Sequence, residues 1–116
     1  MMTRLFLEYP KCSTCRKAKK YLEENNVEFI DRHIVEDNPT AEELTEWINK
    51  SSLPVKKFFN TSGKLYKDMG LKDKLAAMSD EEQISLLASN GMLVKRPLII
   101  EEERVLVGFK EAEWKF

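Results

Sequence analysis

The sequence predicts an α/β fold whose elements follow in the order strand-helix-strand, several helices, then strand-strand-helix. Three patterns predict this order: a helix-spaced apolar pattern between two apolar runs near the start, an almost wholly helical stretch over 40–90, and two apolar runs after Gly91. The chain has 116 residues, of which 42% are hydrophobic, and no repeat or Gly/Ser linker divides it. We therefore expect residues 1–116 to form one domain.

The first strand-helix-strand unit lies before residue 35. A short apolar run over Thr3–Leu7 predicts a strand, and apolar residues then recur at helical spacing from Cys15 to the turn at Asn25-Asn26. Branched and aromatic residues over Val27–Ile34 predict a second strand. A crossover of this kind favours parallel pairing of the two strands.

The middle of the chain carries repeated signals for the starts of helices. Thr40 and Glu43 have the spacing of a capping box, and Ser79 and Glu82 repeat it before the next apolar pattern. Pro54 can occupy the first turn of a further short helix. After this stretch, the runs "RPLII" and "RVLVG" predict an antiparallel hairpin, followed by a short helix over Glu111–Trp114.

The stretch "YPKCSTCRK" places two cysteines at the predicted junction of the first strand and the first helix. A thiolate at the first turn of a helix faces unpaired backbone N–H groups and the positive end of the helix dipole, which lowers its pKa by roughly one unit. Lys11, Arg16 and Lys17 extend that shift. We therefore expect Cys12 to be the nucleophile and Cys15, one turn deeper, to resolve a mixed disulfide.

The two cysteines could instead form a structural disulfide, bind zinc or be inert buried thiols. A disulfide across so small a loop adds only about 2 kcal/mol of stability, which makes a purely structural bridge unattractive. Structural zinc needs four ligands, and the chain offers two cysteines and His33, its single histidine, for which a surface position is expected. Two inert buried thiols remain open, but the cations around the pair favour redox chemistry.

The composition points to no nucleic acid and no membrane. Nineteen basic and twenty acidic side chains leave a net charge of −1, and no apolar run approaches the ~18 residues of a spanning helix. The lysines at 11, 17, 19 and 20 are typical of a solvated helix face. With no signal peptide evident in "MMTRLFLEYP", we expect a cytoplasmic monomer.

Four motifs, "YPKCSTCRKAKKYL", "LPVKKFFNTSGKLYK", "LVKRPLII" and "VGFKEAEW", together resemble the arsenate reductase-related ArsC/Spx family over essentially the whole chain. The resemblance implies a thioredoxin-like fold. In it, β-α-β and β-β-α halves form a mixed four-stranded sheet, with a helical insertion at about 38–91. Members of the family include glutaredoxin-coupled arsenate reductases and Spx-type regulators that bind the RNA polymerase alpha subunit.

The same resemblance assigns roles to individual residues. Cys12 takes the family's catalytic position, and Arg96 and Pro97 match a pair in which the proline is cis and the arginine faces the cysteine. A guanidinium in that place stabilises a thiolate or an oxyanion. The residues expected to dock the substrate are Pro97, Ser13, Thr14, Lys11 and Arg16.

The chain also departs from the patterns of both functional classes. Glu8 replaces the histidine of the arsenate reductases, and Asn60 and Gly108 or Phe109 stand where they carry further arginines, so arsenate reduction is disfavoured. "CSTCRKA" is close to the Spx motif, but "NKSSLP" lacks the glycine expected at the polymerase contact.

The resulting expectation is a small thiol-dependent oxidoreductase with catalytic Cys12, Cys15 and Arg96. No metal or bound organic cofactor is implied, and electrons would come from glutathione, glutaredoxin or thioredoxin. The alternative is an Spx-type redox-sensing regulator whose partner is the RNA polymerase alpha subunit.

Overall fold

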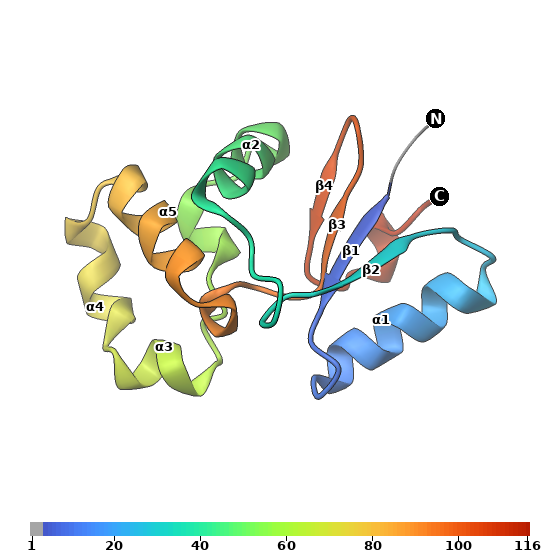
Figure 1. Ribbon diagram of the computed structural model, residues 1–116, viewed down its shortest axis with the longest axis horizontal. Coiled ribbons are helices and arrows are strands. Elements are labelled where there is room, and N and C mark those ends of the chain that lie inside the picture. The colour runs from blue at the N-terminus through green and yellow to red at the C-terminus, as the bar shows by residue number, and fades with distance from the viewer. Residues whose placement is uncertain (1–3) are drawn as a thin grey trace.

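A computed structural model of the chain describes residues 4–116 and shows a mixed four-stranded sheet in the order β2-β1-β3-β4 (Figure 1). The central strand β1 (Leu5–Glu8) runs parallel to β2 (Ile30–His33) and antiparallel to β3 (Leu98–Ile100). An antiparallel hairpin joins β3 to β4 (Val105–Val107), which forms one edge of the sheet. The predicted β-α-β and β-β-α halves of a thioredoxin-like fold are confirmed.

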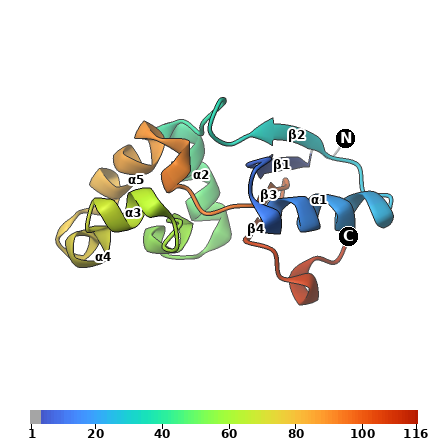
Figure 2. The same cartoon turned by 90° about the horizontal axis from the view of Figure 1, so that it is seen from below.

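Helix α1 (Ser13–Glu24) covers one face of the sheet together with the C-terminal segment (Figure 2). Its buried residues Cys15, Ala18 and Leu22 lie on one side of the helix, as their spacing predicts. The apolar cluster on this face consists of Phe6, Ala18, Leu22, Ile99, Leu106 and Trp114. This packing fixes the start of α1 directly beyond the end of β1.

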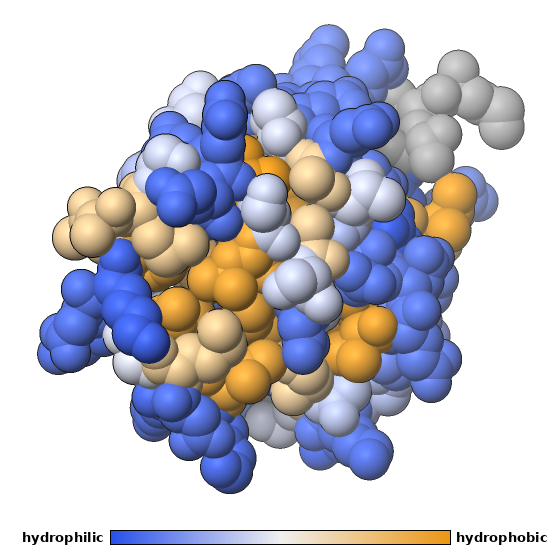
Figure 3. Space-filling view, turned by 60° about the vertical axis from the view of Figure 1, so that its left-hand side comes forward, coloured by the Kyte–Doolittle hydropathy of each residue, from blue (hydrophilic) through white to orange (hydrophobic). Residues whose placement is uncertain are grey.

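The predicted helical insertion packs on the opposite face of the sheet, from α2 (Ala41–Ser51) to a 3-10 turn at Gly91–Leu93. Between them lie a 3-10 turn at Val55–Phe58, α3 (Lys64–Asp68), α4 (Leu71–Lys74), a 3-10 turn at Leu75–Ala77 and α5 (Asp80–Ser89). The larger apolar cluster joins insertion and sheet and includes Leu7, Ile34, Leu44, Trp47, Phe58, Phe59, Leu87, Leu98 and Ile100. With the helical end turned forward, hydrophobic side chains reach the surface between hydrophilic ones (Figure 3).

Both predicted capping boxes are present at the starts of α2 and α5. Thr40 accepts the Glu43 backbone N–H at 3.1 Å, and the Glu43 carboxylate accepts the Thr40 N–H at 3.0 Å. Ser79 and Glu82 make the same reciprocal pair at 3.1 and 3.0 Å. These local hydrogen bonds satisfy N–H groups that the helices themselves leave unpaired.

Some predicted element ends differ from the structure. The second strand begins at Ile30 rather than Val27, because the end of α1 continues into a turn in which Asn26 has φ of 56° and the Val27 N–H donates to Leu22 O at 2.9 Å. The helix predicted over Glu111–Trp114 is a 3-10 turn at Glu111–Glu113. The first strand ends at Glu8, and Thr3, where it was predicted to begin, lies outside the described residues.

The insertion approaches the sheet closely at Gly91. A Cβ atom there would lie 2.0 Å from the Ile34 carbonyl oxygen, so only glycine fits. This contact fixes the segment that leads from the insertion into β3. Among residues 4–116, no helix has the length and apolar character needed to cross a membrane.

Candidate active site

Cys12 is the N-cap residue of α1, in extended conformation, and its sulfur accepts the backbone N–H of Cys15 at 3.4 Å. The Cys12 N–H donates to Tyr9 O at 2.9 Å, and its carbonyl accepts from Arg16 N at 3.1 Å. The cap therefore fixes the sulfur at the positive end of the helix. Cys12 is partly exposed, Cys15 is fully buried, and both are free thiols.

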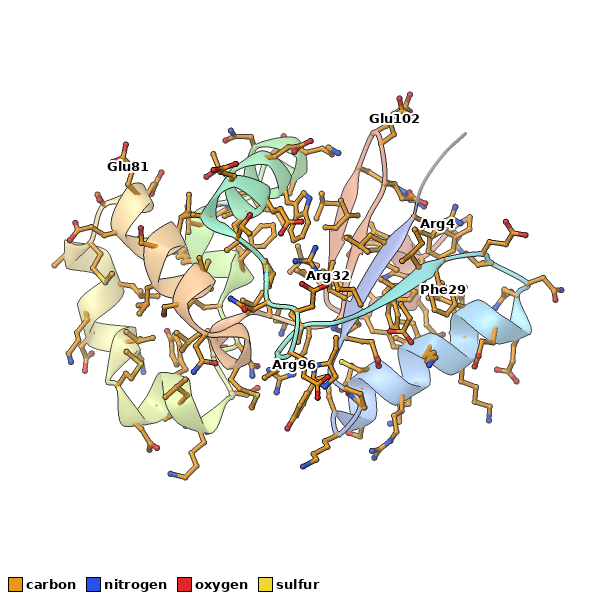
Figure 4. The ribbon with its side chains drawn as sticks, viewed as in Figure 1. Arg4, Phe29, Arg32, Glu81, Arg96 and Glu102 are labelled. Atoms are coloured by element: carbon orange, nitrogen blue, oxygen red, sulfur yellow. The ribbon has the colours of Figure 1, made fainter. Side chains whose placement is uncertain are left out.

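Arg96 lies in the segment between the insertion and β3, in the middle of the molecule near the start of α1 (Figure 4). Its Nη1 donates to Met92 O at 3.3 Å, and its guanidinium carbon lies 5.1 Å from the centre of the Tyr9 ring. Its buried Nε makes no hydrogen bond to any described residue. The Arg96–Pro97 peptide bond is cis, as the family resemblance implied.

The environment gives the two thiols opposite pKa shifts. Partial burial alone would raise the pKa of Cys12, but hydrogen bonds from Cys15 and the charge and hydrogen bonding of Arg96 lower it below the ordinary cysteine value. Burial raises the pKa of Cys15 to about 12, and the neighbouring Cys12 adds to the rise. The arrangement therefore makes Cys12 the more readily ionised of the two thiols, and it keeps Cys15 a neutral thiol at neutral pH.

A cavity of about 890 Å³ opens beside Cys12, between the sheet and the helical insertion. Its walls come from the start of α1, the segment after α2, the turn at 60–63, the segment before β3, and β4 with the residues that follow it. The residues that line it include Cys12, Leu53, Lys56, Lys57, Asn60, Lys95, Arg96, Val105, Val107, Gly108, Phe109, Lys110 and Glu113.

The structure brings some of the predicted site residues together and separates others. Thr14 and Arg96 line the cavity with Cys12, as do Asn60, Gly108 and Phe109, the residues expected in place of further arginines. Lys11, Ser13 and Arg16 are exposed and do not line it; Arg16 instead donates to Pro10 O at 3.2 Å. Pro97 is buried and does not line the cavity.

Glu8 does not line the cavity. Its side chain is 5% exposed, and its pKa is raised by burial and by the neighbouring carboxylate of Asp31, an effect that Lys19 and His33 oppose. Lys19 itself pairs with Asp31 at 2.8 Å. Glu8 therefore belongs to a group of charged side chains apart from the cavity.

Sequence reasoning missed three lysines that line the cavity. Lys56, Lys57 and Lys95 line the cavity, although in the sequence they stand out only as members of the motifs that carry the family resemblance. They come from the two segments that flank the insertion's inner helices, so only its packing on the sheet brings them to Cys12. Among the described residues, no group of three or more His, Cys, Asp or Glu side chains is arranged to hold a metal ion.

The mixed sheet, with a cysteine capping the helix that follows its first strand, defines a protein of thioredoxin-like fold. Comparison with protein families then identifies the particular branch. The chain belongs to the ArsC family, whose model matches residues 7–116. The predicted ArsC/Spx-like relationship is confirmed.

Individual relatives include proteins named for different activities. The uncharacterized protein YusI of Bacillus subtilis is 54% identical over 98% of this chain and 97% of its own length, and the regulatory protein MgsR of the same organism is 28% identical over 93% and 84%. A "putative ArsC family related protein" from Bacteroides fragilis superposes with TM-score 0.95 at 64% identity, covering 97% of this chain and 94% of its own. A "possible arsenate reductase" from Streptococcus mutans superposes at 0.89 with 44% identity, covering 97% and 96%.

Proposed function

We propose that this protein is a small thiol-disulfide oxidoreductase in which Cys12 attacks and Cys15 resolves. The observation that carries the proposal is the asymmetry of the pair. Cys12 lines the cavity beside Arg96, and the pKa of its thiol is lowered. Cys15 is buried, and the pKa of its thiol is raised to about 12.

The chemistry needs two sulfur exchanges. The Cys12 thiolate attacks one sulfur of a substrate disulfide, forms a mixed disulfide and releases the other half as a thiolate. Cys15 then attacks the Cys12 sulfur, the second substrate thiolate leaves with the Cys15 proton, and the Cys12–Cys15 disulfide remains. Two electrons pass from the cysteine pair to the substrate, and glutathione, glutaredoxin or thioredoxin would return them.

Arg96 has a defined part in this proposal. Its charge stabilises the Cys12 thiolate, and its buried, unpartnered Nε favours a negative charge nearby. Tyr9 and Met92 O hold the guanidinium in place. We expect Arg96→Met to raise the pKa of Cys12 and Arg96→Lys to keep part of the shift.

The proposal is tested by titrating the thiols and by assaying turnover. We expect Cys12 to be alkylated with a pKa below that of free cysteine, and Cys15→Ser to trap a mixed disulfide on Cys12 that mass spectrometry detects. The wild-type protein should reduce bis(2-hydroxyethyl) disulfide with glutathione as the donor. An ordinary Cys12 pKa together with no turnover would refute the proposal.

Arsenate is not the substrate that we propose. Asn60, Gly108 and Phe109 line the cavity where arsenate reductases of the family are expected to carry further arginines. A single guanidinium offers fewer charged donors to a tetrahedral oxyanion than a cluster does. We expect no arsenate turnover with glutathione and glutaredoxin under conditions that support disulfide reduction.

A second candidate is a redox-sensing regulator, favoured by the similarity to MgsR and to proteins named global transcriptional regulator Spx. In this role the Cys12–Cys15 disulfide would change a surface that binds the RNA polymerase alpha subunit. Capture of purified alpha subunit by only one redox state, without turnover of any disulfide, would favour this candidate. Binding in neither state would exclude it.

A further inference from the structure

The outer edge of the sheet at β4 has unpaired backbone groups. β4 pairs with β3, and the hydrogen bonds that flank this pairing run from Gly108 N to Pro97 O at 2.8 Å and from Glu101 N to Arg104 O at 2.9 Å. Hydrogen-bonded pairs alternate with non-bonded pairs along an antiparallel ladder. The N–H and C=O groups of Val105 and Val107 therefore point away from β3.

Within the described residues, these outward N–H and C=O groups have no hydrogen-bond partner. No bond to the backbone N–H or C=O of Val105 or Val107 from outside the β3-β4 ladder occurs among residues 4–116. Figure 1 shows β4 as the strand nearest α2, with β3 on its other side. An edge of this kind is a template for pairing with another extended chain.

The β4 edge and the reactive thiol border the same cavity. Val105, Val107 and Cys12 all line the space of about 890 Å³ beside the start of α1. Cavities of roughly 300–1,000 Å³ hold drug-sized ligands, which are far larger than a tetrahedral oxyanion. Leu53, whose side chain is 40% exposed, and Phe109 add apolar surface to the same walls.

The walls of this cavity are strongly basic. Lys56, Lys57, Lys95 and Arg96 line it, and no carboxylate of the described residues lies within salt-bridge distance of the three lysines. The acidic residue in the lining, Glu113, lies 3.8 Å from Lys110 and balances that cation. Because the whole chain carries a net charge of −1, this excess of positive charge is local.

We propose that the β4 edge takes up an extended acidic segment of a partner protein, which adds a strand to the sheet and presents a disulfide to Cys12. This inference rests on the proposed function and names its substrate class. Outward N–H and C=O groups of Val105 and Val107 match the backbone of an added strand, whereas an oxyanion has no donor for the carbonyls. Lysine side chains on the walls select carboxylates on the incoming segment.

The reaction on such a segment consists of the same two sulfur exchanges. The Cys12 thiolate attacks the disulfide sulfur of the segment's cysteine and releases the thiolate that was bound to it. Cys15 then displaces the segment as a free thiolate, and the Cys12–Cys15 disulfide forms. The partner's disulfide is the oxidant, and a thiol such as glutathione reduces the enzyme afterwards.

Synthetic peptides test the charge and the mode of binding. In the acidic peptide, glutamate and valine alternate on both sides of a cysteine that forms a mixed disulfide with 2-mercaptoethanol. In the matched basic peptide, lysine replaces each glutamate. We expect kcat/KM at low salt to be about tenfold higher for the acidic peptide and the difference to shrink with added salt. Equal values for the two peptides would overturn the proposal.

Backbone methylation separates strand addition from simple charge attraction. In two further acidic peptides, N-methyl groups are placed on one or the other alternate set of amides. Methylation of the amides that face β4 should abolish the preference for the acidic peptide, and methylation of the other amides should preserve it. Amide chemical shifts of Val105 and Val107 should move on titration of the reduced acidic peptide into Cys12→Ser protein. Identical effects of the two sets, or unmoved shifts, would contradict pairing at this edge.

Protein variants supply matched controls for charge. Lys56→Glu with Lys57→Glu should remove the preference for the acidic peptide, whereas Lys72→Glu with Lys74→Glu, on exposed positions of α4, should leave it. Reduction of uncharged bis(2-hydroxyethyl) disulfide distinguishes failure of the docking proposal from failure of the proposed function. If this disulfide is reduced while the peptides show no preference, only the docking proposal fails. If it is not reduced either, the proposed function fails.

Discussion

At the starts of α2 and α5, Thr40 and Ser79 each accept the backbone N–H of the residue three positions on, and a glutamate at that third position bonds back. At the start of α1, Cys12 accepts the same N–H through sulfur, at 3.4 Å. The third position there is Cys15, which cannot return the bond as a carboxylate does. One capping geometry thus occurs in three places with different chemistry.

The charges of the first turns differ in the same way. α2 carries Glu42 and Glu43 in its first turn and α5 carries three acidic residues, whereas α1 carries none. At neutral pH these carboxylates interact favourably with the positive ends of the α2 and α5 helix dipoles. At α1 that role is left to the Cys12 thiolate, so the positive end of the helix is available to stabilise a reactive anion.

The largest effect is expected from Cys12→Ser, which removes the nucleophile of α1 but keeps its N-cap. In Cys12→Ser, the hydroxyl is a better N-cap than sulfur but a far weaker nucleophile at neutral pH. Disulfide reduction should fall by at least about 1,000-fold while the thermal midpoint stays unchanged or rises. Thr40→Ser, the equivalent conservative change at α2, should alter neither. Retained turnover in Cys12→Ser would remove the distinction between the helix starts.

The second effect concerns the capping box of α2 and its dependence on pH. Arg32 donates to both oxygens of Glu43, at 2.7 and 2.9 Å, and together with the Thr40 N–H it lowers the pKa of Glu43 to about 2. Because the folded pKa lies below the unfolded value, this stabilisation is complete above about pH 4.5 and is lost as the pH falls toward 2.

Glu43→Gln measures that contribution. The carboxylate is 34% exposed, so after allowance for solvent screening we expect a loss of about 1–2 kcal/mol in the free energy of unfolding at neutral pH. Urea unfolding at a series of pH values should show the difference from wild type vanishing near pH 2. Glu46→Gln, at an exposed position of the same helix, is the control. A difference that persists at the lowest pH would show that Glu43 acts through packing rather than charge.

The third prediction concerns the caps themselves. Thr40→Ala and Ser79→Ala each remove an acceptor for one backbone N–H and should cost about 1 kcal/mol of stability, by denaturant unfolding. Disulfide reduction and the pKa of Cys12 should not change, since neither cap borders the cavity. Ser85→Ala, at an exposed position in the middle of α5, serves as the control that removes a hydroxyl without removing a cap.

The same comparison explains what could be predicted from the sequence. Both capping boxes and the position of Cys12 depend on neighbours within a few residues, so spacing alone predicted them. Arg96 reaches the site from a distant part of the chain, and only the family resemblance indicated it. The late start of β2 depended on a turn at Asn26 that pattern reasoning did not anticipate. The lysines of the cavity required knowledge of how the insertion packs.

The smallest effect is expected from a substitution that gives the first turn of α1 an acidic residue like those in the first turns of α2 and α5. Ser13→Asp places a carboxylate in the first turn of α1, at an exposed position beside Cys12. The new charge should stabilise the helix slightly and raise the pKa of Cys12, lowering disulfide reduction about twofold below that pKa. Ser13→Asn, which adds similar bulk without charge, should leave the rate unchanged. Since the group is exposed, the effect should also shrink with added salt. Equal rates for both variants at low salt would mean that local hydrogen bonds, rather than the field of the helix, control the thiol.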